Sequence, residues 1–172
     1  CIRDRLTTTT LACTCKKIIS PAMNTQMYQN QITQDNLQKL RDYGFEVIDP
    51  ATGMLACRDV GEGKLPDPEI LLDYILKEIA YEKDMKGLNV LVTAGPTTEA
   101  IDPVRYITNH STGKMGYAIA NCAMLRGANV TLVTGPTSLP KPPFVNTISI
   151  KSAEEMFDAC LLYTSPSPRD LS

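Results

Sequence analysis

The sequence lacks most of the features that mark membrane and secreted proteins. Among its 172 residues, no apolar run approaches the roughly 20 residues needed to cross a bilayer. No apolar core follows the charges of residues 1–10, so this opening is not a signal peptide. Seventeen basic and nineteen acidic side chains leave a net charge of -2. This balance argues against a dedicated surface for nucleic acid or for an anionic membrane.

Histidine is nearly absent as well. His110 is the only one, it follows no zinc-ligand spacing, and none of the six cysteines forms a C-x-x-C pair. The sequence therefore predicts no metal site built from its own side chains. We expect a reduced, cytoplasmic protein in which most cysteines are small buried apolar residues.

Residues 1–80 are predicted to form a first unit of short strands and helices. Apolar residues at helical spacing, followed by Gly44, predict a helix over 33–44. An Asp-Pro pair predicts the start of an amphipathic helix over 68–82. The remaining predicted elements are strands at 16–20 and 45–50 and a loop over 51–67.

A charged segment at 81–87 is predicted to link this unit to a second one at 88–159. The continuous apolar stretch 89–95 is typical of a strand buried in a parallel sheet. A long loop and a helix over 116–126 are expected to follow it. Next come predicted strands at 129–136 and 145–150, then a helix that opens with a Ser-x-x-Glu capping box at Ser152. This alternation indicates a doubly wound α/β domain.

The two ends of the sequence look unusual. The chain starts without methionine, so we expect that the true start is missing. The end, "CLLYTSPSPRDLS", breaks the helical pattern and resembles translated sequencing-adapter DNA. We therefore interpret residues 160–172 as a non-native tail. The alternative is a natural disordered tail.

The stretch "NHSTGKMG" at 109–116 has the physical features of an anion site. It is not a Walker A loop, because Thr108 stands where the first glycine should be and Met115 follows the lysine. The dinucleotide pattern G-x-G-x-x-G is also missing. Even so, a glycine-rich loop leads from a buried strand into a helix, whose first N–H groups and positive dipole end favour phosphate. From spacing alone, an ordinary glycine-rich connection remains almost equally acceptable.

Longer motifs give the chain a family resemblance. The stretch "NVLVTAGPTTEAIDPVRYITNHSTGKMGYAIA" resembles the start of a phosphopantothenate–cysteine ligase domain. Upstream, "PAMNTQMY" and "ACRDVGEGKLPD" resemble the late motifs of a phosphopantothenoylcysteine decarboxylase domain. Both sets occur in this order in the bifunctional bacterial decarboxylase/ligase family of coenzyme A biosynthesis. The resemblance covers residues 1–159.

The resemblance implies a definite domain plan. Residues 1–80 correspond to the C-terminal part of an FMN-dependent, flavoprotein-type Rossmann-like domain. Residues 88–159 correspond to the N-terminal part of a doubly wound nucleotide-binding ligase domain. The flavin-phosphate loop and active-site histidine of the family precede this chain, and the ligase lysine motif follows it. We therefore expect this segment alone to be inactive.

For the ligase half, the resemblance implies a nucleotide-dependent acyl transfer. The carboxylate of 4′-phosphopantothenate reacts with CTP and Mg²⁺ to give an acyl-cytidylate, and the amine of L-cysteine then attacks it. Asn109 is the implied catalytic residue, a neutral donor that holds an acyl oxygen. Arg105 of the "DPVR" motif contacts substrate or pairs with Asp102, and both interpretations stay open. We expect a structural role for His110. The implied nucleotide-binding residues are Gly95, Pro96, Thr97, Ser111, Thr112, Gly113, Lys114 and Gly116.

For the decarboxylase half, the resemblance implies flavin chemistry on a thiol. FMN oxidises the substrate thiol, carbon dioxide leaves, and a cysteine returns a proton. Cys57 is the implied proton donor, and a thiol of ordinary pKa is mostly protonated at neutral pH. A buried structural role for Cys57 is the alternative. Asn24 is implied to bind the substrate carboxylate, together with the neighbouring residues Ala22 and Met23.

The implied product of the two steps is 4′-phosphopantetheine. We expect small-molecule partners only, no nucleic acid or membrane, and a homo-oligomer, by analogy with the family. CTP and ATP are not distinguished by the sequence. Alternatives are a decarboxylase-like flavoprotein with a non-catalytic or regulatory role, and a generic dinucleotide-binding module.

Overall fold

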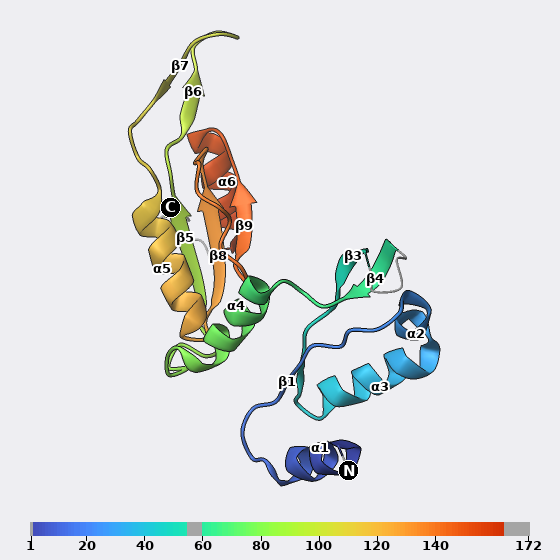
Figure 1. Ribbon diagram of the computed structural model, residues 1–172. Coiled ribbons are helices and arrows are strands. Elements are labelled where there is room, and N and C mark those ends of the chain that lie inside the picture. Colours follow the sequence, from blue (N-terminus) through green and yellow to red (C-terminus); the bar gives the residue numbers. More distant parts are fainter. Residues whose placement is uncertain (1, 55–59, 164–172) are drawn as a thin grey trace. The chain divides into compact units, whose positions relative to one another are not determined.

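The computed structural model describes residues 2–54 and 60–163. It divides into two units, residues 1–75 and 76–172 (Figure 1). The division falls within helix α4 (Pro68–Ile79), a few residues before the predicted linker at 81–87. Across the described residues, no helix combines the length and the apolar character that a membrane span requires.

The first unit contains short helices and two small sheets. Its elements are α1 (Ile2–Ala12), β1 (Ile18–Ile19), α2 (Thr25–Gln29), α3 (Gln31–Asp42), β2 (Glu46–Val47), β3 (Ala51–Met54), β4 (Val60–Lys64) and most of α4. Helix α2 lies against β4, and α3 lies against β2. Helix α3 confirms the predicted helix at 33–44. It begins where the Asn30 side chain accepts a hydrogen bond from the Ile32 N–H at 2.9 Å. It ends just before Gly44, whose φ of 83° suits glycine. Leu37 of α3 and Ile48, which follows β2, are the buried hydrophobic residues of the described part of this unit.

The prediction of a loop over 51–67 is wrong in part, because this segment contains a β-hairpin. Strands β3 and β4 pair antiparallel, with Gly53 opposite Gly61. Glycines at facing positions remove the side-chain alternation by which strands are recognised in a sequence. The hairpin therefore depends on backbone pairing, which a sequence pattern does not reveal.

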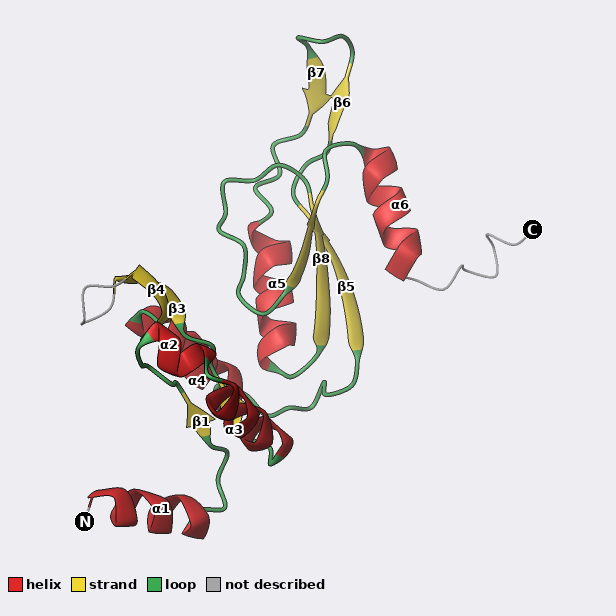
Figure 2. Cartoon of the chain, turned by 90° about the vertical axis from the view of Figure 1, so that its right-hand side faces the viewer, coloured by secondary structure: helices red, strands yellow, loops and turns green. Residues whose placement is uncertain are grey.

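The second unit contains the predicted parallel sheet. Strands β5 (Asn89–Ala94), β8 (Asn129–Thr134) and β9 (Asn146–Ser149) lie in the order β5-β8-β9, all parallel. Helix α5 (Lys114–Leu125) covers one face and helix α6 (Ala153–Tyr163) covers the other (Figures 1 and 2). Alternate residues of the central strand serve the two faces, Leu132 packing with α5 and Val133 with α6. This arrangement confirms the predicted doubly wound α/β fold.

Helix α6 extends further than predicted. Its capping box forms, since the Ser152 hydroxyl accepts from the Glu155 N–H at 3.2 Å. The Glu155 carboxylate accepts from the Lys151 N–H at 2.6 Å, whereas in a capping box it would accept from the Ser152 N–H. The helix continues to Tyr163, and Cys160 packs against the core. The prediction that the helical pattern breaks at residue 160 is therefore wrong. The non-native origin of the tail stays a prediction.

The predicted long loop before α5 contains a second hairpin, which the sequence interpretation missed. Strands β6 (Thr98–Ala100) and β7 (Tyr106–Thr108) pair antiparallel, and the hairpin extends beyond the carboxyl end of β5 (Figure 1). Its base is fixed to α6, because the Thr98 N–H donates to the Lys151 carbonyl at 2.7 Å and the Ala153 N–H donates to the Glu99 carboxylate at 2.9 Å.

Candidate functional site

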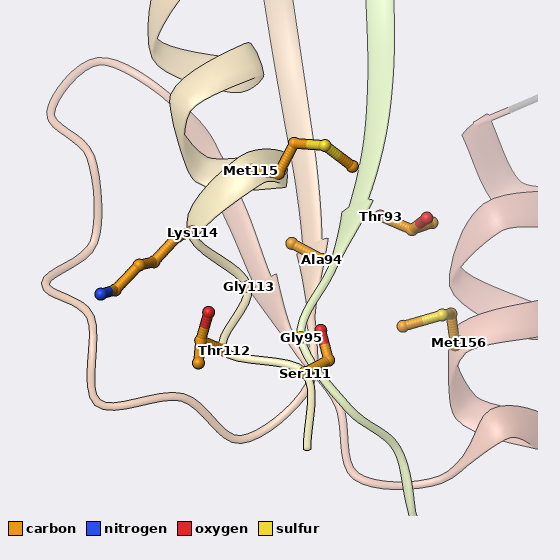
Figure 3. Close-up of a pocket in the computed structure, with 10 residues that line it drawn as sticks. Thr93, Ala94, Gly95, Ser111, Thr112, Gly113, Lys114, Met115 and Met156 are labelled. Carbon is orange, nitrogen blue, oxygen red and sulfur yellow. The ribbon is translucent and has the colours of Figure 1, made fainter. Parts of the chain in front are cut away.

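A pocket of about 250 Å³ lies where β5 ends and α5 begins (Figure 3). The structure brings six of the predicted nucleotide-binding residues together there: Gly95, Ser111, Thr112, Gly113, Lys114 and Gly116. The remaining lining residues were not predicted: Thr93, Ala94, Met115 and Met156. Met156 comes from α6, a long way along the chain from the loop, so no local sequence signal identifies it.

Two glycines allow the pocket to have this shape. Gly113 precedes α5 with a φ of 74°, a conformation that side-chain-bearing residues avoid. A Cβ at Gly116 would lie 2.6 Å from the Ala94 Cβ and 3.0 Å from the Thr93 carbonyl oxygen. Glycine at position 116 therefore lets the first turn of α5 lie directly against β5.

The electrostatic character of the pocket comes mainly from the backbone. The first N–H groups of a helix have no partner within the helix, and the first residues of α5, Lys114–Gly116, line the pocket. No side chain caps α5, since its N-cap is a glycine. The helix start can therefore offer its N–H groups and dipole to an anion. The Lys114 side chain extends away from Thr93 and Met156 (Figure 3), so its contribution is through the backbone and through charge at longer range.

Three predicted residues do not line this pocket: Asn109, Pro96 and Thr97. The side-chain oxygen of Asn109 accepts from the Ser111 N–H at 2.9 Å, which folds the loop immediately before the pocket wall. Thr97 holds the base of the hairpin, because its carbonyl oxygen accepts from the Thr108 hydroxyl at 2.8 Å. Asn109 is exposed on the surface next to the pocket, as is His110.

The "DPVR" motif forms the tip of the β6–β7 hairpin. Arg105 Nε donates to Asp102 at 2.6 Å, and the N–H groups of Val104 and Arg105 donate to the same carboxylate at 2.9 and 2.7 Å. These backbone N–H groups and the Arg105 guanidinium lower the pKa of Asp102. The geometry supports the structural ion pair, one of the two interpretations considered for Arg105. The Arg105 side chain remains largely exposed to solvent.

In the first unit, the two decarboxylase-like motifs lie against each other. The Met23 N–H donates to the Gly63 carbonyl at 3.0 Å. Gly63 has a φ of 131°, and a Cβ there would lie 2.1 Å from the Met23 carbonyl oxygen. Asn24 begins α2, accepting from the Gln26 N–H at 2.9 Å. The Ala22–Asn24 segment is thus held beside β4. The predicted proton donor, Cys57, lies outside the described residues.

Two hydroxyl oxygens near this segment, those of Ser20 and Thr25, are buried and have no hydrogen-bond partner in the part of the chain that the structure describes. The Thr25 oxygen packs directly against the backbone of β4, because it is the nearest atom to a Cβ built at Gly61. Burying a hydroxyl without a partner costs free energy.

Side chains that could bind a metal are scattered. Within residues 2–54 and 60–163, no group of three His, Cys, Asp or Glu side chains is close enough to hold an ion. A divalent cation at the α5 pocket would therefore depend mainly on ligand phosphate oxygens. Mg²⁺ often binds proteins in this way, through substrate phosphates, water and one or two carboxylates.

Comparison with known proteins agrees with the motif analysis. Residues 2–80 match the family model described as "Flavoprotein", and residues 85–166 match "DNA/pantothenate metabolism flavoprotein C-terminal domain". The coenzyme A biosynthesis bifunctional protein CoaBC of Vibrio vulnificus strain YJ016 is 52% identical over 162 residues, which are 94% of this chain and 40% of the relative. The CoaBC protein of Bacillus subtilis strain 168 is 46% identical over 161 residues, with 92% and 40% covered.

A solved structure titled as the C-terminal domain of coenzyme A biosynthesis bifunctional protein CoaBC is 52% identical, with a TM-score of 0.45, covering 45% of this chain and 40% of that one. The chain spans about 40% of the length of the curated relatives it matches. Its two matched segments occupy nearly all of its length in the order flavoprotein, then pantothenate-metabolism domain. The chain therefore belongs to the family of bifunctional coenzyme A biosynthesis proteins and carries a flavoprotein segment followed by a pantothenate-metabolism flavoprotein C-terminal segment.

Proposed function

We propose that the protein carrying this chain joins 4′-phosphopantothenate to L-cysteine at the expense of CTP and then decarboxylates the product to 4′-phosphopantetheine. The observation that carries the proposal is the pocket at the start of α5. There, residues of "NHSTGKMG" and "AGPT" meet in a chain that is about half identical to bifunctional coenzyme A proteins.

In the ligase step, this pocket binds the phosphates of CTP. The N–H groups at the start of α5 donate to phosphate oxygens, and glycine at 95, 113 and 116 permits their close approach. A carboxylate oxygen of 4′-phosphopantothenate attacks the α-phosphorus, and pyrophosphate leaves. The cysteine amine then attacks the acyl carbon, and CMP leaves. A bound Mg²⁺ would neutralise charge during the displacement, and it would depend on phosphate oxygens of the ligand, since the described residues offer no cluster of three metal-binding side chains.

Asn109 contributes an uncharged donor beside the pocket. Its side-chain oxygen is used by the Ser111 N–H. This hydrogen bond orients the amide so that its NH₂ group remains available to an acyl oxygen. A neutral donor can stabilise negative charge on that oxygen without competing as a nucleophile. Asn109 thus both shapes the loop and serves as the proposed catalytic residue.

In the decarboxylation step, the segment Ala22–Asn24 orients the substrate. Asn24 holds the departing carboxylate by hydrogen bonding, and the β3–β4 hairpin keeps the segment in place through the Met23–Gly63 hydrogen bond. Cys57 donates a proton to the product carbon. FMN, when bound, would supply the oxidation and reduction of the substrate.

We also propose that the protein is a cytoplasmic homo-oligomer, with ligase residues at 88–159. The β6–β7 hairpin favours self-association, because it exposes the apolar side chains of Ile101, Val104 and Ile107. Exposed apolar side chains grouped on one projecting element are typical of protein–protein contacts. A tail of non-native origin at 160–172 remains part of the proposal.

Calorimetric titration of the complete gene product with CTP and Mg²⁺ tests the proposed function. We expect saturable CTP binding and, with both substrates and FMN present, formation of 4′-phosphopantetheine. Saturable NADPH binding in place of CTP would favour a dinucleotide-binding module. FMN binding without either product would favour the regulatory flavoprotein.

A further inference from the structure

Behind the α5 pocket, the Thr137 side chain packs against the backbone at two glycines that line the pocket, Gly95 and Gly113. A Cβ built at Gly95 would lie 2.8 Å from the methyl carbon of Thr137, and one built at Gly113 would lie 3.0 Å from the same carbon. The Gly113 position also lies close to Gly95, with 3.3 Å between that Cβ and the Gly95 nitrogen. The Thr137 methyl group therefore fills the space that both glycines leave open.

Thr137 is not a lining residue of this pocket. It belongs to the turn that follows β8, and its methyl group reaches the backs of the two glycines from the far side of the wall. The pocket side of the same glycines faces the proposed phosphate site. Thr137 lines a separate cavity of about 310 Å³ together with Tyr117 and Thr134. At the α5 pocket, it acts through the placement of Gly95 and Gly113.

The hydroxyl of Thr137 is held by a chain of hydrogen bonds. The Tyr117 hydroxyl lies 3.0 Å from the Thr137 hydroxyl and 3.2 Å from that of Thr134. Thr134, which is 3% exposed, donates its own proton to the Gly135 carbonyl at 3.1 Å. Because each hydroxyl has one proton, Tyr117 must donate to Thr134 and accept from Thr137. This order fixes the direction of the Thr137 hydroxyl.

Fixing the hydroxyl also fixes the methyl group. Both groups are attached to the same Cβ, and a β-branched side chain has few staggered conformations. With the oxygen directed to Tyr117, the methyl carbon is directed to Gly95 and Gly113. Tyr117 itself belongs to α5 and is 9% exposed, so the chain of hydroxyls links the body of α5 to the wall of the pocket at its first turn.

We propose that Thr137 is a positioning residue for the nucleotide pocket. Its methyl group sets the separation of the turns at Gly95 and Gly113, and its β-branched shape, whose other arm meets the Tyr117 hydroxyl, keeps that methyl in place. The proposal rests on the proposed function in one respect, namely that the pocket binds the phosphates of CTP. It names a residue that sequence motifs do not identify, because Thr137 follows a different strand from the two glycines.

Two substitutions separate the roles of the methyl and the hydroxyl. Thr137→Val keeps the methyl group that faces the glycines and removes the hydroxyl. Thr137→Ser keeps the hydroxyl and removes the methyl. We expect the Kd of the complete gene product for CTP to rise about fivefold in Thr137→Ser, on the order of one buried methyl group, and to change less than about twofold in Thr137→Val.

Thr147→Ser is the matched control, because it removes the same methyl group from a part-buried threonine of β9. We expect it to leave the Kd for CTP unchanged. Amide hydrogen exchange without nucleotide gives a second readout. Exchange at residues 111–116 should accelerate in Thr137→Ser, and should match wild type in Thr137→Val and Thr147→Ser.

The outcomes distinguish this proposal from the proposed function. If the wild-type protein does not bind CTP, the proposed function fails, and the exchange rates alone decide the role of Thr137. If the wild type binds CTP but Thr137→Ser binds as well as Thr137→Val, or better, the positioning role is overturned. Equal exchange at 111–116 in the two variants overturns it as well.

Discussion

The left-handed glycine at the start of α5 offers a sharp test of the α5 pocket. Gly113 has a φ of 74°, and a Cβ there would approach Thr137 to 3.0 Å and the Gly95 nitrogen to 3.3 Å. Gly87 is a matched position in the same unit. Its φ is 85°, and a Cβ there would have no neighbour within 4 Å. Gly113→Ala and Gly87→Ala therefore impose the same kind of backbone strain, but only the methyl group of Gly113→Ala crowds residues at the α5 pocket.

The expected magnitudes follow from this comparison. An alanine in the left-handed region costs about 1–2 kcal/mol, so both variants should lose at least that much free energy of unfolding. In Gly113→Ala, the added methyl must also displace the loop, which moves the N–H donors at the start of α5. Losing one hydrogen bond to a charged phosphate costs about 1.5–3 kcal/mol, which corresponds to at least about a tenfold rise in Kd.

Urea unfolding and CTP titration of the complete gene product measure the two effects separately. We expect Gly87→Ala to lose about 1–2 kcal/mol of unfolding free energy and Gly113→Ala to lose somewhat more, because its methyl also crowds Gly95. CTP binding should weaken only in Gly113→Ala. Equal CTP affinity in Gly113→Ala and Gly87→Ala would refute the placement of the phosphates at the start of α5. A large stability loss in Gly113→Ala alone would show that the loop is a structural connection.

Two further predictions concern the surroundings of the site. The Lys83 ammonium donates to carbonyls in the last turns of two helices, at Lys77 of α4 and, at 2.6 Å, at Leu125 of α5. Lys83→Met should therefore lower the free energy of unfolding, measured by urea titration, by about 1–3 kcal/mol. Lys86→Met, at an exposed position, should leave it unchanged. At the hairpin tip, the pKa of Asp102 is lowered by backbone N–H groups and Arg105, so the folded tip is stabilised above the ordinary aspartate pKa and loses that stabilisation only as the pH falls through the lowered value. NMR of the Val104 and Arg105 amides should show the tip intact at pH 5 and opening in stronger acid, and Asp102→Asn should remove this pH dependence; a tip that opens near pH 5 would contradict the assignment.

Periodic and buried elements of the fold were predictable from the sequence. Helix α3 has an apolar face and a glycine stop, and α4 begins at an Asp-Pro pair. Strands β5 and β8 are rich in valine and leucine, because both faces of a parallel sheet are covered by helices. In each case a local pattern reflects the burial of that same element.

The two hairpins were missed for a physical reason. β3–β4 contains glycines at facing positions, and β6–β7 leaves its apolar residues exposed, so neither shows the alternation of a half-buried strand. Both hairpins are defined by backbone pairing and by contacts with residues distant in sequence, such as the Ala153 N–H that donates to Glu99.

For the site, the family motifs identified six of the pocket residues, since these lie in two short segments. Met156 and Thr137 escaped, because Met156 lines the pocket from α6 and Thr137 packs behind the two glycines from the loop after β8. Asn109 lies beside the pocket and not among its lining residues, which only the loop geometry reveals. Cys57 remains a prediction, since it lies outside the described residues.

The most direct test of the account is amide hydrogen exchange of the complete gene product with and without CTP and Mg²⁺. The account predicts that CTP slows exchange at the start of α5, in residues 111–117, and in the turn at 95–97. It predicts little change at 18–24, in the other unit. Saturating CTP that leaves 111–117 unchanged would contradict the claim that this helix start binds the nucleotide phosphates.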